Sequence, residues 1–261
     1  MAFQTILFDS ADGIARLTLN RPDRLNSLDR VMLVEIREAF DRIRTDASIR
    51  ALLITGSGRA FCAGQDLQDP GALESPEAVG ALVSKFYNPM IGDLRNLEIP
   101  VIAVVNGVAA GAGSSLALAC DLVLAARSAS FVQAFGRIGL IPDAGGSAML
   151  PRLVGPARAL GLALLGEPLP AETAEAWGLI WRCVPDEALS GEADALAARL
   201  ATQATRALGL TKRAINGAAD RSLEQQLDVE ADLQAKAADT ADFREGLAAF
   251  LEKRPARFTG R

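Results

Sequence analysis

Short apolar runs that alternate with longer helical patterns are the feature that most constrains how this chain folds. Runs rich in apolar and β-branched residues, bounded by Gly, Pro or Asp, are typical of strands and occupy residues 5–8, 15–19, 51–55, 101–105 and 122–125. Helical patterns separate several of these runs. Because parallel neighbouring strands need crossover connections, the alternation predicts an α/β fold with a buried and largely parallel sheet.

The clearest helical pattern covers residues 29–44. Its apolar residues recur at steps of three and four, with charged residues between them, and include Leu33, Ile36, Phe40 and Ile43. Ser27 is a candidate N-cap for this helix. We expect the apolar face to cover one side of the sheet.

The character of the sequence changes beyond about residue 185, where alanine-rich stretches predict helix after helix without a strand pattern. The 261 residues are enough for one large domain with an appendage, and we predict an α/β core over 1–190 and a helical region over 191–261. The apolar stripes of this region pack either on the core or on a neighbouring subunit, and they include Leu227, Leu233, Phe243, Leu247 and Phe250.

The chain contains no histidine, which restricts its chemistry. Ser-His-Asp triads, Cys-His pairs, His-ligated zinc sites and a His general base are all excluded. Acid-base chemistry must therefore use carboxylates, Lys, Tyr or Cys. The formal charge of −5 disfavours binding to nucleic acid or to an anionic membrane.

Cysteine usage and the N-terminal sequence predict a cytoplasmic protein. The three cysteines are widely spaced and form no CxxC pair of the kind used for zinc or redox work. The first ten residues, MAFQTILFDS, lack the basic and apolar regions of a signal peptide, and no apolar run approaches the roughly 20 residues of a membrane span. We expect no metal site.

A loop of small residues at 106–115 follows the strand predicted at 101–105. Gly107, Gly111 and Gly113 leave peptide N–H groups accessible, and a helix that starts near Ala112 adds the partial positive charge of its N-terminus. Such a loop can hold an anion or a developing oxyanion, or it can simply allow a helix to pack tightly on a strand. Dinucleotide and P-loop motifs fit it poorly, because Leu116 stands where a third glycine is needed and no GxxxxGK[ST] occurs.

A second glycine loop, GSGRAFCAGQDL, follows the strand predicted at 51–55 and again exposes backbone donors where the strand ends. Its Cys62 has no histidine or adjacent lysine to stabilise a thiolate, so we interpret it as a packed thiol.

The third element is GRIGLIPDAGG, in which Asp143 stands between a proline and small residues in apolar surroundings. An aspartate before small residues is commonly a turn residue or a helix N-cap. If it instead faces a dry pocket, desolvation raises its pKa and makes it a stronger base. The residues alone leave both interpretations open.

The order of these elements resembles the enoyl-CoA hydratase/isomerase (crotonase) family along nearly the whole chain. The motifs that carry the resemblance are NRPDRLNSL, GRAFCAGQDL, NGVAAGAGSSLALACD, GLIPDAGG and the C-terminal AFLEKRPARF. The resemblance implies a crotonase-like spiral of ββα units with a C-terminal helical trimerisation region, assembled as a homotrimer or hexamer. It also implies an acyl-CoA thioester substrate, whose carbonyl oxygen binds to the backbone N–H groups of Gln65 and Ala112, without another cofactor.

Two departures from the family pattern bear on the reaction. Hydratases of the family carry glutamates where this chain has Ser115 and Phe135, which we assign to the acyl pocket. Neither residue can activate water, so hydration becomes the second choice. A catalytically silent acyl-CoA-binding protein is the third.

Aspartate at position 143 resembles three branches of the family: dienoyl-CoA isomerases, aryl-CoA dehalogenases and the ring-epoxide isomerases of phenylacetate breakdown. The dehalogenases also use a histidine, and the dienoyl-CoA isomerases retain a glutamate at the position of Phe135. The third branch matches further, in LPRLVG and ALLGEPLPAETAEAWGLIW. The resemblance therefore implies that Asp143 removes the α-proton of ring 1,2-epoxyphenylacetyl-CoA, and that an enolate rearranges to an oxepin. Double-bond shifts in unsaturated acyl-CoAs use the same groups.

The resemblance also assigns residues around the substrate. Backbone contacts to the adenine are expected around Ala63, Asp66 and Leu67, with Arg24 near the phosphates and Lys253 reaching in from the C-terminal helices. Either basic residue is equally explained as a solvated surface charge. Residues 85–87 lie in a variable stretch where acyl specificity is set, whereas Trp177 and Trp181 are interpreted as core or interface residues.

Overall fold

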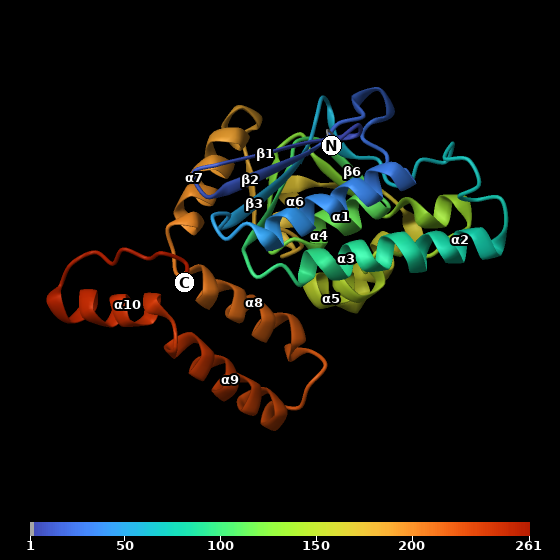
Figure 1. The fold of residues 1–261 in the computed structure, drawn as a ribbon. Coiled ribbons are helices and arrows are strands. Elements are labelled where there is room, and N and C mark those ends of the chain that lie inside the picture. The colour runs from blue at the N-terminus through green and yellow to red at the C-terminus, as the bar shows by residue number, and fades with distance from the viewer. Residues whose placement is uncertain (1–2) are drawn as a thin grey trace.

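A computed structural model describes residues 3–261, and a six-stranded sheet forms the centre of the fold (Figure 1). Its strands lie in the order β1 (Ile6–Ala11), β2 (Ile14–Leu19), β3 (Ala51–Gly56), β5 (Val101–Val105), β7 (Leu122–Ala126) and β10 (Arg182–Val184). Strands β1 and β2 form an antiparallel hairpin, and all later pairings are parallel. The prediction of an α/β fold with a largely parallel sheet is confirmed.

A second sheet contains four short strands: β4 (Ala60–Cys62), β6 (Val108–Ala110), β8 (Ser130–Val132) and β9 (Leu169–Pro170). Strands β4, β6 and β8 are parallel to one another. The first two lie inside segments that the sequence presents only as glycine loops. Strands of three residues are too short to show an alternating pattern, so this sheet could not be read from the sequence.

The two sheets arise from a repeating unit of a long strand, a short strand and a helical segment. The unit repeats as β3–β4, β5–β6 and β7–β8, each pair being followed by helix. The helices before the C-terminal region are α1 (Arg30–Thr45), α2 (Pro76–Leu82), α3 (Asn88–Arg95), α4 (Ala112–Ala119), α5 (Gly146–Leu165) and α6 (Ala171–Ala176). Helix α4 is fully buried, so the spiral closes around it.

Helix α1 shows which part of the sequence prediction was wrong. Its predicted apolar face is buried, including Leu33, Ile36 and Phe40. The N-cap, however, is Asp29, whose side chain accepts a hydrogen bond from the Met32 N–H at 2.8 Å. Ser27 lies too far ahead of the first helical residue to cap it.

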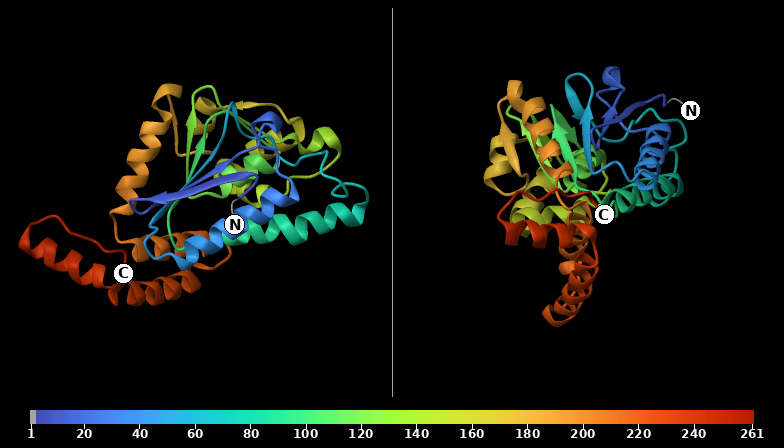
Figure 2. Two further views of the ribbon diagram at one scale, coloured as in Figure 1. Left: turned by 45° about the horizontal axis from the view of Figure 1, so that its top comes forward. Right: turned by 60° about the vertical axis from the view of Figure 1, so that its left-hand side comes forward.

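Four helices follow the last strand, and no described residue after Val184 lies in a strand, as predicted: α7 (Leu189–Ala201), α8 (Thr205–Ala218), α9 (Leu223–Ala238) and α10 (Ala241–Glu252). Helix α7 packs against β3, β5 and β7 of the main sheet. Helices α8 to α10 extend away from both sheets, as all three views show (Figures 1 and 2). The division of the chain at residue 190 stays a prediction.

Most of the apolar stripe on these helices does not pack on the core of its own chain. Leu233 is buried, but Leu227, Phe243, Leu247 and Phe250 are exposed. Helix α8 is fixed to the core by an ion pair between Lys212 and Asp121, with N and O 2.9 Å apart. Helices α8 to α10 form a C-terminal arm. Its outer part therefore presents an apolar surface that no described part of the chain covers.

Helix α5 is the one helix within residues 3–261 that is long and apolar enough, by length and composition alone, to cross a membrane. Arg152 and Arg158 lie within it, so it is not an uninterrupted apolar run. Helices inside globular proteins meet the same criterion, and α5 is interrupted by Gly155, whose φ of 77° is not helical. Its N-terminal end packs on α4, which brings the preceding loop to the centre of the molecule.

Candidate active site

The three loops singled out from the sequence meet at one edge of the short-stranded sheet. Strands β4, β6 and β8 are neighbouring and parallel, so their carboxyl ends lie side by side. The loop after β4 carries Gln65, the residues after β6 carry Ala112, and the segment after β8 carries Phe135 and Asp143. The second sheet, which the sequence did not disclose, is what brings these residues together.

Two glycines allow the first two loops to touch. A Cβ atom on Gly64 would lie 2.8 Å from the carbonyl oxygen of Ala110 and 3.4 Å from the backbone nitrogen of Ala112. A Cβ atom on Gly113 would lie 2.4 Å from the carbonyl oxygen of Cys62. Any side chain at either position would push the loops apart. These glycines therefore allow the loops to pack tightly, and they also leave the backbone donors of the loops accessible.

The backbone N–H of Gln65 points away from the strand-like contact that holds its loop. Leu28 pairs with Gln65 as an isolated parallel bridge, in which the Leu28 N–H donates to the Gly64 carbonyl and the Asp66 N–H donates to the Leu28 carbonyl. Successive peptide groups of an extended segment point to opposite sides. The Gln65 N–H therefore faces the other way, and it has no acceptor among residues 3–261.

The backbone N–H of Ala112 is free for a different reason. Ala112 is the first residue of α4, and the first N–H groups of a helix have no intrahelical acceptor. The preceding N–H, that of Gly111, already donates to the Val132 carbonyl at 2.8 Å. Because α4 is buried, the partial positive charge at its N-terminus is little screened by water. The site thus offers two unengaged donors on adjacent loops.

The backbone of Asp143 forms part of a turn, but its side chain does not stabilise that turn. Its carbonyl accepts a hydrogen bond from the Gly146 N–H at 2.8 Å, and Ala144 follows with a φ of 49°. The N-cap of α5 is Gly145, so the Asp143 carboxylate caps no helix. Its Oδ1 atom is buried and has no hydrogen-bond partner within the described chain. Burial raises the pKa of this carboxyl from its ordinary value of 3.8 to about 6.

A cavity of about 230 Å³ contains all of these groups. Gln65, Ala112, Phe135 and Asp143 line it together with Ala63 and Leu67. Its apolar wall comes largely from the segment around α2 and from the loop before Asp143, with Leu73, Val79, Leu82, Val83, Tyr87, Ile138 and Leu140. The cavity thus has a polar end with two amides and one carboxylate, and a wall that is otherwise largely apolar.

The sequence analysis missed one residue that lines the cavity and wrongly assigned another residue to it. Arg137 also lines the cavity, and no motif singled it out. Ser115, predicted to lie in the acyl pocket, does not line the cavity. It is fully buried on α4, where its Oγ atom would lie 2.7 Å from a Cβ on Gly146.

The remaining candidates divide between the site and the scaffold. Cys62 is fully buried and burial raises the pKa of its thiol to about 12, which confirms a packed thiol. Trp177 packs partly buried against the core, whereas Trp181 is exposed, and neither lines the cavity. Of residues 85–87, only Tyr87 lines it.

The residues expected around CoA are only partly brought together. Arg24 is exposed beside the cavity loop, where its Nη1 donates to the Gln68 Oε1 at 2.5 Å. The Asp66 carboxylate is already engaged by Arg21 at 2.8 Å and by the Gln68 N–H at 2.9 Å, and its backbone N–H donates to the Leu28 carbonyl at 2.8 Å. Lys253 ends α10, away from the cavity. Its role stays a prediction.

The sequence and the fold can now be compared with known proteins. The sequence pattern described as enoyl-CoA hydratase/isomerase matches residues 9–261. The chain belongs to this family. It is 53% identical, over 98% of both chains, to the 1,2-epoxyphenylacetyl-CoA isomerase of Escherichia coli (strain K12). It is 48% identical, over the full length of both, to a probable enoyl-CoA hydratase of Rhodobacter capsulatus.

Solved structures of the enoyl-CoA hydratase/isomerase family confirm the crotonase-like fold predicted from the motifs. The enoyl-CoA hydratase of Bacillus anthracis superimposes with a TM-score of 0.93 at 35% identity, and the match covers 99% of this chain and 100% of that one. The chain is therefore an enzyme of the crotonase family that acts on acyl-CoA thioesters by hydration or isomerisation. Which of the two reactions it performs depends on the groups in its own cavity.

Proposed function

We propose that the chain is an acyl-CoA isomerase that works through a thioester enolate, and that its substrate is ring 1,2-epoxyphenylacetyl-CoA. The observation that carries this proposal is the buried Oδ1 atom of Asp143, which has no hydrogen-bond partner among the described residues, in a cavity with two free backbone N–H groups and no second carboxylate among its lining residues. Proton abstraction next to a carbonyl needs one base and an oxyanion site. Water addition by a carboxylate pair needs another acid that this cavity lacks.

The proposed reaction begins when the thioester oxygen accepts hydrogen bonds from the N–H groups of Gln65 and Ala112. Asp143 takes the proton from the carbon next to the carbonyl, and the electron pair of that C–H bond becomes the C=C bond of an enolate. Charge that develops on the oxygen is stabilised by about 3 kcal/mol for each donor.

The enolate then opens the three-membered ring by cleavage of its C–C bond, which expands the carbocycle to a seven-membered oxepin. Asp143 returns the proton to a ring carbon, so substrate and product have the same formula. No redox cofactor or metal enters this scheme. The presence of Phe135 in the cavity supports the proposal of an aromatic substrate. Its ring lines the cavity, and its Cζ atom is 3.9 Å from the position that a Cβ atom on Gly111 would occupy.

Hydration is the alternative that a specific observation favours, because several of the similar proteins carry hydratase names, including the Rhodobacter capsulatus protein. The E. coli isomerase, with the higher identity, supports isomerisation. A binding protein without catalysis is disfavoured by the raised pKa of Asp143, which suits a base working near neutral pH.

Two substrates separate these functions. Ring 1,2-epoxyphenylacetyl-CoA should be converted to an isomer of equal mass, detected by liquid chromatography with mass spectrometry. Crotonyl-CoA should lose its enone absorbance slowly or not at all. Rapid hydration of crotonyl-CoA without isomerisation of the epoxide would reverse this assignment, and binding of both esters without turnover would favour the non-catalytic alternative.

The rate should depend on pH through Asp143. The carboxylate form is the base, and burial raises the pKa of this group to about 6. The value of kcat/KM should therefore be constant above pH 7 and fall about tenfold per pH unit below pH 6. Steady-state rates between pH 4.5 and 9, at saturating and limiting substrate, measure this profile. A midpoint near 4 would mean that the base is a solvated carboxylate.

We further propose that the CoA moiety lies along the loop of Ala63, Asp66 and Leu67, with Arg24 beside its phosphates. Arg24 is exposed next to this loop, and Leu67 is an exposed wall of the cavity, which supports the arrangement. Lys253 is assigned to the same substrate from the C-terminal arm. The expected compartment is the cytoplasm, in keeping with three unpaired cysteines.

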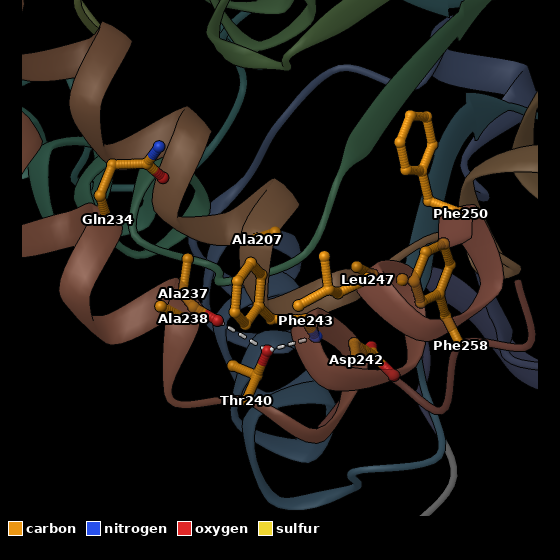
Figure 3. Close-up of a pocket in the computed structure, with 12 residues that line it drawn as sticks. Ala207, Gln234, Ala237, Ala238, Thr240, Asp242, Phe243, Leu247, Phe250 and Phe258 are labelled. Carbon is orange, nitrogen blue, oxygen red and sulfur yellow. Dashed lines mark hydrogen bonds between the residues drawn. The ribbon is translucent and has the colours of Figure 1, made fainter. Parts of the chain in front are cut away.

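The C-terminal arm supports the proposal that the chain forms a homotrimer or hexamer. An apolar hollow of about 680 Å³ lies among α8, α9, α10 and the C-terminal tail. Figure 3 shows Phe243, Leu247, Phe250 and Phe258, which line this hollow. Exposed aromatic and leucine side chains on one surface are typical of a subunit interface.

Changing Phe250 to glutamate should weaken this assembly. Its side chain is 81% exposed within the chain, so the substitution costs the isolated fold little. In an interface it would bury a charge, at a cost of several kcal/mol. Sedimentation velocity should then show smaller species. Leu7→Glu, at a residue 54% exposed on β1, is the matched control. Equal sedimentation of all three proteins would contradict the arm as the interface.

A further inference from the structure

The tyrosine Tyr87, the only one in the chain, is buried beside the candidate oxyanion site and has no role in the reaction described above. It closes a short π-helical segment, Val83–Tyr87, between α2 and α3. Single π-helical turns are rare and occur frequently at functional sites, because the extra residue redirects the side chains around it. Here the segment places both Val83 and Tyr87 on the wall of the cavity.

The hydroxyl of Tyr87 donates a hydrogen bond to the Gln65 side-chain oxygen, Oε1, at 2.7 Å. The amide nitrogen of the same side chain, Nε2, donates to the Asp66 carbonyl at 2.9 Å. Both polar ends of the Gln65 side chain are therefore held. The backbone on the other side of this residue is held by the bridge to Leu28. These contacts restrain Gln65, whose own N–H is left free to face the cavity.

The Tyr87 hydroxyl is a dependable donor in this place. Burial raises its pKa well above the ordinary value, so the hydroxyl remains protonated at any pH at which the protein works. Without it, the Gln65 Oε1 atom would lose its only described partner, and the side chain would be held only through its Nε2 atom.

We propose that Tyr87 is a positioning residue for the oxyanion site: its hydroxyl holds the Gln65 side chain and thereby keeps the Gln65 backbone N–H directed at the thioester oxygen. This inference rests on the proposed function and deepens it. It also links two parts of the site, because the segment that forms the apolar wall for the acyl group is the segment that holds the oxyanion loop.

The first test compares Tyr87→Phe, Gln65→Leu and the double variant. Each single change should lower kcat for isomerisation about tenfold, with little change in KM, because the lost restraint matters most when charge develops on the oxygen. The double variant should be no slower than either single variant, since both remove the same contact. The pH midpoint should stay near 6 in all of them, because Asp143 is unchanged.

A second readout does not need turnover. The thioester 4-(dimethylamino)cinnamoyl-CoA absorbs at longer wavelength when donors polarise its carbonyl oxygen. Bound to the native enzyme, it should show such a shift, and the shift should shrink by about half in Tyr87→Phe, as one of two donors becomes misdirected. Ser84→Ala changes an exposed residue of the same segment that does not line the cavity, and it should leave both kcat and the shift unaltered.

Three outcomes decide the matter. A native shift with a smaller shift in Tyr87→Phe supports the positioning role, even if the native enzyme does not isomerise the epoxide, in which case only the proposed substrate fails. Multiplying losses in the double variant would overturn the role, because they would mean that the two residues act independently. Loss of thermal stability in Tyr87→Phe with unchanged kcat and unchanged shift would also overturn it.

Discussion

Asp143→Asn should lower the rate of isomerisation on the order of 10³-fold while acyl-CoA binding is preserved. Asparagine has nearly the same shape as aspartate but cannot accept the α-proton. The two backbone donors stay in place, because they belong to other loops of the site. The loss should therefore appear in kcat and hardly at all in the dissociation constant of a substrate analogue.

Solvent deuterium exchange at the α-carbon of a bound acyl-CoA measures the same step without product formation. Exchange should occur with the native enzyme and disappear in Asp143→Asn. Asp12→Asn, at an exposed turn with a φ of 53° that asparagine also adopts, is the matched control and should exchange normally. Exchange that survives in Asp143→Asn would remove this residue from its assigned role.

The same variant should be more stable than the native protein at neutral pH. Because the folded pKa of Asp143 is raised to about 6, the fold favours the neutral acid. The resulting penalty is absent below about pH 3, where the group is protonated in both states, and is complete above about pH 7. Allowing for partial solvent screening, Asp143→Asn should gain about 1–2 kcal/mol at pH 8 and nothing at about pH 3. Urea unfolding at both pH values measures the difference.

Gly113→Ala should be among the most damaging small substitutions in the chain. Its added methyl group would lie 2.4 Å from the Cys62 carbonyl oxygen and 2.7 Å from the Cys62 Cβ and Sγ. Such overlap forces backbone to move and costs about 3 kcal/mol of folding free energy or more. The movement would also separate the loops that carry the Gln65 and Ala112 donors, so activity should fall even in the protein that remains folded.

Gly161→Ala is the matched control for this prediction. Gly161 lies within α5, and a Cβ atom there would meet nothing within 4 Å. Alanine is a better helix former than glycine, so this variant should be unchanged or up to about 1 kcal/mol more stable. Denaturant unfolding and kcat/KM should be measured on both. Equal stability of the two variants would show that the loops separate without cost and that close packing of α4 on β4 is not required.

Most of the main sheet could be predicted from the sequence because five of its six strands are five or six residues long and rich in apolar residues, whereas β10, with three residues, was not predicted. The short-stranded sheet could not, although it organises the site. Strands such as Ala60–Cys62 and Val108–Ala110 form because their neighbours are already in place, and three residues carry no periodic signal. The sequence therefore predicted the loops of the site but not the edge at which they meet.

Predictions for individual residues were right or wrong for local structural reasons. Ser27 and Asp29 are both plausible caps, and only the starting point of the helix distinguishes them. Ser115 was expected in the pocket on the basis of resemblance, but the close approach of α5 at Gly146 covers it. No sequence motif marks Arg137 as a cavity residue or Tyr87 as a contact of Gln65. A single side chain at a cavity wall is recognisable only when its neighbours in space are known.

The sequence by itself determined that the base must be a residue other than histidine, because the chain contains none. It also offered Asp143 as a candidate, because this aspartate stands in an apolar loop. It also determined the family, through motifs in a fixed order. Only the tertiary structure decided that this carboxylate caps no helix, is desolvated and shares a cavity with two free amides. The physical reason is that pKa and hydrogen-bond vacancy depend on which distant segments exclude water, and those contacts join residues far apart in the chain.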